Sequence, residues 1–143
     1  ERIVEFSDAD SIPPAIDYHL IRLYLRTGRV VSNNKHVFNN LKTGTTHRMR
    51  LVRLLRESVA EALSMTASYA KIPVHEVNYV EWQIARSRCE KDFTNCDGEW
   101  PADLLDSSVI NLSGSCPLRD SCSAYANPAW KKIIEPELKK SFY

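Results

Sequence analysis

The sequence predicts an all-α protein whose C-terminal end is an irregular segment built around cysteines. Two observations support this fold class. Apolar residues recur at helical spacing in three segments between residues 15 and 88, and all four cysteines lie within residues 89–122, where that periodicity fades. The chain has 143 residues, of which 43% are hydrophobic and 26% charged, and its net charge is +1. This composition is typical of a globular protein, and any affinity for nucleic acid must come from a local patch.

The first helix is expected over residues 15–26. Pro13 and Pro14 precede it, and proline is accepted in a first helical turn because the N–H that it lacks has no partner there. Gly28 is expected to end the helix, since glycine readily adopts the left-handed conformation found after a helix. Residues 29–44 are rich in asparagine and are expected to form a loop with at most one short turn.

Two longer helices are expected over residues 45–69 and 74–88, the second opening after Pro73. The chain then divides into a helical part (1–88), a cysteine segment (89–125) and a basic tail (126–143). The apolar positions expected to be buried are Leu51, Leu54, Leu55, Val59, Ala62, Leu63 and Met65 or Thr66 in the first helix, and Val77, Val80, Trp82, Ile84 and Ala85 in the second.

The four cysteines form two pairs, and their spacing points to a metal site. Six residues separate Cys89 from Cys96, five separate Cys116 from Cys122, and nineteen lie between the pairs. Clustered thiols without a secretion signal favour a metal over disulfides. Structural zinc sites use tighter pairs, whereas wider spacers suit an iron–sulfur cluster, whose irons lie farther apart than bonds to one ion. The spacing favours a [4Fe–4S] cluster and leaves zinc, or unligated or paired thiols, as alternatives.

A second motif stands upstream of the cysteines. Residues 16–22 read Ile-Asp-Tyr-His-Leu-Ile-Arg, and residues 26–28 read Arg-Thr-Gly. With both motifs, residues 10–125 resemble the C-terminal half of the endonuclease III-like, helix-hairpin-helix (HhH-GPD) DNA glycosylases. That family has a catalytic segment of the same pattern and binds its cluster through Cys-x6-Cys-x2-Cys-x5-Cys. The outer spacers match here, but the insertion at residues 97–115 replaces the two residues of the middle spacer.

The resemblance implies the helical-bundle half of a glycosylase, with Asp17 as catalytic carboxylate and Cys89, Cys96, Cys116 and Cys122 as ligands of a [4Fe–4S] cluster. It implies an enzyme that removes a damaged, mismatched or modified base from DNA by N-glycosidic cleavage. In the family a helix-hairpin-helix precedes the aspartate, so we expect an N-terminal segment or a partner chain to complete the site, and strand cleavage by an AP lyase step stays open. The start of the chain without methionine also suggests a longer precursor.

Three alternatives remain at this stage. In the first, Asp17 serves only as the cap of the helix that follows it. The whole chain is alternatively a non-catalytic module, stabilised by an iron–sulfur cluster or zinc, that binds nucleic acid or protein. A third reading keeps the fold but gives it a free or RNA nucleoside as substrate.

Basic residues flank the thiols. Arg86, Arg88, Lys91 and Arg119 are candidate DNA contacts, where each cation adds sequence-independent affinity for phosphate. The same cations are equally suited to offset the negative charge of a four-thiolate cluster. No apolar run has the length of a membrane span, and because residues 1–5 lack an apolar stretch we expect no secretory signal. We therefore expect no membrane partner and a cytoplasmic protein, which would lie at the nucleoid in a bacterium or archaeon and in the nucleus of a eukaryote.

Overall fold

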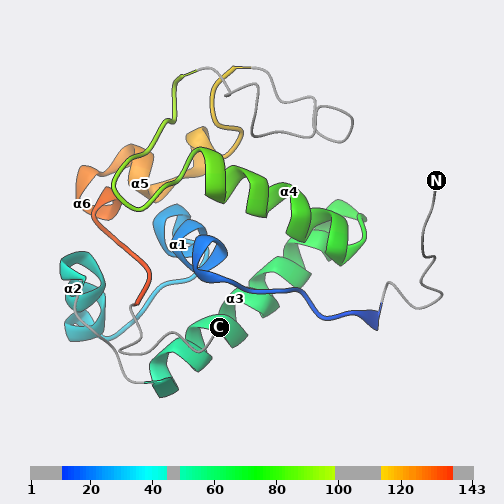
Figure 1. Ribbon diagram of the computed structural model, residues 1–143, viewed down its shortest axis with the longest axis horizontal. Coiled ribbons are helices and arrows are strands. Elements are labelled where there is room, and N and C mark those ends of the chain that lie inside the picture. Colours follow the sequence, from blue (N-terminus) through cyan, green and yellow to red (C-terminus); the bar gives the residue numbers. More distant parts are fainter. Residues whose placement is uncertain (1–10, 45–48, 99–113, 137–143) are drawn as a thin grey trace.

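The computed structural model describes residues 11–44, 49–98 and 114–136, and it confirms an all-α protein (Figure 1). The described residues contain no β-strand, only an isolated antiparallel bridge between Cys89 and Thr94. The helices are α1 (Tyr18–Thr27), α2 (Lys35–Thr43), α3 (Met49–Ala70), α4 (Val74–Ser87), the 3-10 helix η2 (Arg119–Ser121), α5 (Ser123–Ala126) and α6 (Pro128–Lys131).

Helix α1 is the centre of the molecule. It contacts α3, α4 and α5, and every side chain from Leu20 to Thr27 is buried. A helix can be buried on all sides only when other elements cover each face, and here α3 and α4 lie along one side while the C-terminal segment covers the other (Figure 1). The helix begins after Asp17, later than predicted. The predicted end is confirmed, because Gly28 caps the helix with a φ of 79°.

Helices α3 and α4 follow the predictions closely. Buried residues of α3 recur every three or four positions and form one stripe. Leu54 was expected in this stripe, and so was either Met65 or Thr66. Leu54 and Met65 are 47% and 53% exposed because they lie on its flanks, whereas Thr66 is half-buried. Helix α4 ends at Ser87, one residue before the predicted end. The predicted start of α3 at Thr45 or Thr46 lies outside the described residues.

The prediction of a loop over residues 29–44 is wrong, because nine of those residues form α2. The side chain of Asn34 accepts hydrogen bonds from the first turn of α2, and Gly44 closes the helix with a φ of 68°. Leu41, on the inner face of α2, is buried. The ring of Phe38 packs edge-on against Trp130 with 5.0 Å between the ring centroids. The asparagine and glycine that suggested a loop are the caps of a short helix.

The segment after Cys116 returns the chain to the helical core. Ile133 is fully buried, Glu135 is 8% exposed, and the Ile134 amide donates to the Leu41 carbonyl at 3.0 Å. The first part of the predicted basic tail therefore packs against the core, and residues 137–143 lie outside the described ones. A search of the described helices for a membrane span found none of sufficient length and apolar character.

Candidate functional site

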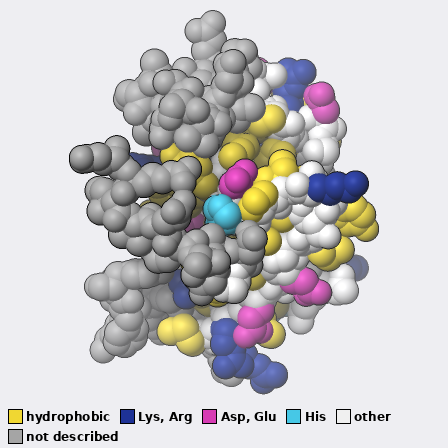
Figure 2. All heavy atoms as spheres, turned by 90° about the vertical axis from the view of Figure 1, so that its right-hand side faces the viewer, with side chains coloured by type: hydrophobic (Ala, Val, Ile, Leu, Met, Phe, Trp, Pro, Cys, Tyr) yellow, Lys and Arg dark blue, Asp and Glu magenta, His cyan; other side chains and the backbone are white. Residues whose placement is uncertain are grey.

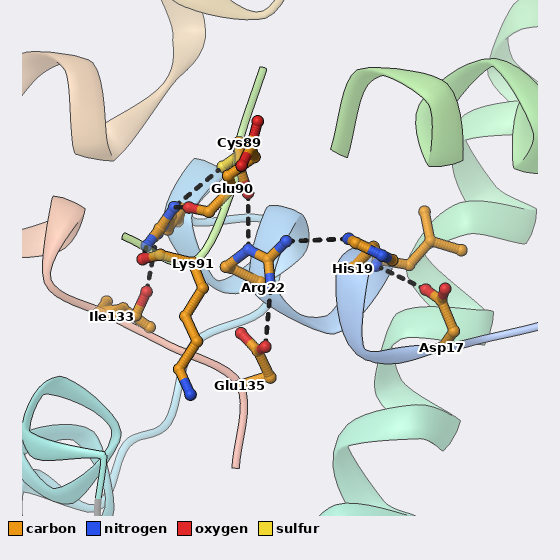
Figure 3. A network of polar contacts seen from close by, with 10 residues as sticks. Asp17, His19, Arg22, Cys89, Glu90, Lys91, Ile133 and Glu135 are labelled. Carbon is orange, nitrogen blue, oxygen red and sulfur yellow. Dashed lines mark hydrogen bonds and ion pairs between the residues drawn. The ribbon is translucent and has the colours of Figure 1, made fainter. Parts of the chain in front are cut away.

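The two predicted motifs lie at opposite ends of helix α1 (Figure 3). Asp17 stands at its N-terminus, and Arg26, in its last turn, contacts Cys89 and Cys122.

Asp17 is held by two hydrogen bonds, one for each carboxylate oxygen. Oδ1 accepts from the Leu20 amide at 3.0 Å, so the helix-cap role is confirmed. Oδ2 accepts from the indole N–H of Trp82 on α4 at 2.9 Å. The chain before Asp17 is also fixed to α4, because the Ala15 amide donates to Asn78 Oδ1 at 2.8 Å. Capping needs only the first of these contacts, and the others hold the carboxylate against α4.

A pocket of about 280 Å³ opens beside Asp17. Figure 2 shows the face of the molecule that lies on the right of Figure 1, where hydrophobic, acidic and basic side chains occur together. A carboxylate offers about four acceptor positions, of which donors within the described residues occupy two, so Asp17 has further acceptor positions for a ligand. Sequence reasoning missed the pocket wall on α4, although its residues recur at the three- to four-residue spacing of one helix face. The lining residues are Ala15, Asp17, His75, Asn78, Tyr79 and Trp82.

Arg22 connects the two ends of α1 (Figure 3). Its side chain is 1% exposed, and its guanidinium contacts His19 Nδ1 at 2.9 Å, donates to the Cys89 carbonyl at 2.6 Å and pairs with Glu135 at 2.8 Å. Because an arginine only donates, His19 Nδ1 accepts, which requires a neutral imidazole. Burial lowers the pKa of His19, an effect that Asp17 and Glu135 oppose and Arg22 and Arg86 reinforce.

Arg26 fixes the path of the cysteine loop. Its guanidinium, also 1% exposed, donates to the carbonyls of Ile133 at 2.7 Å, Glu90 at 2.6 Å and Lys91 at 2.8 Å. It also donates to Cys89 Sγ at 3.5 Å, and the Cys122 thiol lies 3.7 Å from the Arg26 carbonyl oxygen. Burial raises the pKa of the Cys89 thiol, and the Arg26 charge opposes that rise.

Arg88 closes the base of the 97–115 insertion. Its guanidinium donates to the carbonyls of Asn95 at 3.1 Å, Gly98, and Gly114 at 2.7 Å, so it binds both ends of the insertion. The Cys116 amide donates to the Cys96 carbonyl at 2.8 Å. Arg88 therefore holds the two ends of the insertion together, and we call this closed base its neck. The Cys96–Cys116 hydrogen bond brings the two cysteine pairs together despite the nineteen residues between them. Residues 99–113 of the insertion lie outside the described ones.

The four cysteines are free, half-buried and close enough to influence one another. Burial raises the pKa of the Cys116 thiol, and charges on Cys96, Cys89 and Cys122 raise it further. The guanidinium groups of Arg26 and Arg88 lie beside these thiols. Within residues 11–44, 49–98 and 114–136, no three histidine, cysteine or acidic side chains are grouped closely enough to hold a metal ion.

The four predicted DNA contacts have different surroundings, which corrects one of them. Arg88 is 1% exposed and bound to backbone carbonyls, so it organises the loop and is not available to phosphate. Arg119 pairs with Asp97 and Asp120, each at 3.2 Å. Lys91 is half-buried, and its carbonyl binds Arg26. Arg86 is exposed and lies over the ring of Trp82 at 5.1 Å, near Asp17.

Comparisons with protein-family models, curated proteins and solved structures found no match to this chain. Its functional interpretation therefore depends on the residues and geometry described above.

Proposed function

We propose that this chain is the cluster-bearing part of an iron–sulfur DNA glycosylase that removes a base by N-glycosidic cleavage. The observation that carries the proposal is that the cysteine motif packs against the same buried helix that begins at Asp17. Asp17 and Cys89 are far apart in the sequence, yet they lie at the two ends of α1, and Arg22 joins those ends through His19 and Cys89. A chance match of two unrelated motifs gives no reason for this shared scaffold.

The carboxylate pocket supplies what glycosidic cleavage requires. The sugar acquires positive charge as the bond to the base breaks, and a fixed carboxylate stabilises that charge. Asp17 is held from two sides and faces a pocket with spare acceptor capacity. Because its position is fixed before a substrate binds, little reorganisation accompanies the reaction.

The cysteine end would hold the cofactor. Cys89, Cys96, Cys116 and Cys122 would bind a [4Fe–4S] cluster, whose own chemistry is one-electron exchange and cross-linking of the loops that bind it. Arg26 and Arg88 place positive charge beside those thiols.

DNA is the partner that the proposal requires. Arg86 is the best placed of the predicted contacts, because it is exposed and lies one helical turn from Trp82, which holds Asp17. A base must leave the duplex before its glycosidic bond can be reached. We propose that an N-terminal helix-hairpin-helix segment, or a partner chain, supplies the side chains that extrude it.

Replacement of Asp17 tests this function. In the full-length protein, Asp17→Asn should slow base release by roughly 10²–10³-fold, the usual effect of removing a group that stabilises transition-state charge, and should change DNA affinity less than about twofold. The assay uses duplexes that carry uracil, hypoxanthine, 8-oxoguanine or a mismatch. Asp120→Asn is the matched control, because Asp120 is exposed in the cysteine segment.

If Asp17→Asn released the base at the wild-type rate, Asp17 would not be the catalytic carboxylate. Unchanged DNA binding together with no release by any variant on any duplex would favour the non-catalytic module.

A further inference from the structure

The pocket beside Asp17 contains a second side chain capable of proton transfer, which the proposed function does not yet use. His75 lies in the first turn of α4, is exposed, and lines the same pocket as Asp17. We propose that His75 binds the departing base and gives it the proton with which it leaves. This inference rests on the proposed function and adds a catalytic residue to it.

The other polar groups of the pocket wall are already engaged. The side-chain oxygen of Asn78 accepts from the Ala15 amide and its side-chain nitrogen donates to the Ala15 carbonyl, while the Trp82 N–H donates to Asp17. The Tyr79 hydroxyl accepts from Gln83 at 3.0 Å and keeps its own proton. No hydrogen bond or ion pair joins His75 to another described residue.

Two groups of the wall can therefore offer a proton, His75 and Tyr79. Histidine is the better candidate, because it is the side chain that enzymes use most often as a general acid. The faces of Tyr79 and Trp82 suit a flat ring, since aromatic side chains stack on bases of any sequence. The pocket thus combines a carboxylate for the sugar, an imidazole for the base and aromatic surface for the ring.

The bond between C1′ and the base nitrogen breaks, and its electron pair stays with the base. The imidazolium of His75 transfers its proton to a basic ring nitrogen of the base. A water oxygen then bonds to C1′, and the proton that this water loses restores the imidazolium. The products are the free base and a sugar with a hydroxyl at C1′. The expected leaving group is a base with a basic ring nitrogen, such as a purine.

A pair of leaving groups tests the proton transfer. With a duplex that contains hypoxanthine, His75→Ala should slow base release by about 10²-fold, the lower end of the usual contribution of a general acid. With N7-methylguanine, which leaves without receiving a proton, the same variant should slow release less than about threefold. His36→Ala is the matched control, because His36 is also exposed in the first turn of a helix.

The outcomes separate this inference from the proposed function. If His75→Ala slows both substrates equally, or neither, His75 is not the acid, while loss of both activities in Asp17→Asn keeps the proposed function. If Asp17→Asn retains both activities, the proposed function itself fails.

A binding measurement keeps the inference testable without turnover. The imidazole signal of His75, assigned by its loss in His75→Ala, is followed by NMR while hypoxanthine is added to the wild-type protein at millimolar concentration. The His75 signal should shift and saturate while the His36 signal stays in place. No shift of the His75 signal would overturn the inference.

Discussion

The two ends of helix α1 differ in how their polar groups are used. At the cysteine end, the buried guanidinium groups of Arg22, Arg26 and Arg88 bind backbone carbonyls, so the loops follow the positions of these donors. At the Asp17 end, a fixed carboxylate and an exposed histidine face an open pocket with bonding capacity to spare. The polar groups at the cysteine end are used in hydrogen bonds that fix the loops, whereas those at the Asp17 end face a pocket that a ligand could enter.

The difference has a physical cause. A buried guanidinium is costly unless its donors are paired, so the surrounding backbone must supply carbonyls at the right places. A group at the mouth of a pocket is still hydrated and does not impose that demand. Substitutions at the cysteine end should therefore change stability, whereas those at the pocket end should change chemistry.

The largest expected effect on stability comes from Arg26→Met. The substitution keeps apolar bulk but leaves three carbonyls and Cys89 Sγ without their donor. We expect the free energy of unfolding to fall by about 3–5 kcal/mol, the usual cost of breaking a buried charged network. Urea unfolding measures it. Arg86→Met, at an exposed site, should change the same quantity by less than about 0.5 kcal/mol. Equal effects of the two variants would contradict the comparison.

Gly28→Ala should have the next largest effect. Gly28 has a φ of 79°, and an added Cβ would meet the Oγ and Cβ atoms of Ser123 on α5. We expect a loss of about 1–2 kcal/mol from the backbone conformation alone, and a further loss from the contact with Ser123. Gly114→Ala is the control, because Gly114 has a φ of 87° but no atom near an added Cβ. Thermal unfolding of the two variants should separate the contact from the conformation, and a smaller loss at Gly28 than at Gly114 would show that the α1–α5 contact is looser than described.

Excision of the insertion should have a small effect. Replacing residues 99–113 by Asn-Gly keeps Gly98 and Gly114, whose carbonyls bind Arg88. The short pair suits a tight turn. Because the neck is closed without the excised residues, the free energy of unfolding should change by less than about 1 kcal/mol, within the range of changes away from buried features. Metal content per chain should stay the same. Loss of bound metal would show that the insertion contributes to the cysteine site.

The smallest effect is a pH dependence carried by His19. Burial lowers the pKa of His19 in the folded protein below its usual 6.5, so the unfolded chain binds more protons between the two values. The contribution of His19 to the free energy of unfolding is therefore fully present above about pH 6.5. It decreases as the pH falls from that value towards the lower pKa of the folded state. Gln is a suitable replacement, since its amide oxygen can accept from Arg22 but does not titrate. Urea unfolding at about pH 7.5 and about pH 5 should show a smaller pH difference for His19→Gln than for wild type. An unchanged difference would place the titration elsewhere.

Local signals predicted much of the fold. The Gly28 cap and the spans of α3 and α4 follow from apolar spacing and from glycine and proline positions, which act within a few residues. Helix α2 was missed because Asn34 and Gly44 are equally typical of loops and of helix caps, and burial of Leu41 decides between them.

The surroundings of the site could not be predicted from local pattern. Arg88 was a candidate DNA contact because it is a cation that flanks the thiols, yet it is buried and donates to carbonyls on both sides of the insertion neck. Those carbonyls are brought to it by the fold and leave no mark in the sequence. The spacing of His75 and Trp82 places them on one face of a helix. That face becomes a pocket wall only because the chain before Asp17 packs against α4, and the sequence pattern does not show this packing.

The central claim, that the cysteine end and the Asp17 end belong to one iron–sulfur glycosylase, is tested most directly by what the four thiols hold. The measurement is the content of iron, acid-labile sulfide and zinc per chain in protein purified without oxygen. We expect four irons and four sulfides, the composition of a [4Fe–4S] cluster, in a brown protein. A colourless protein with one zinc per chain, or with disulfides and no metal, would contradict it.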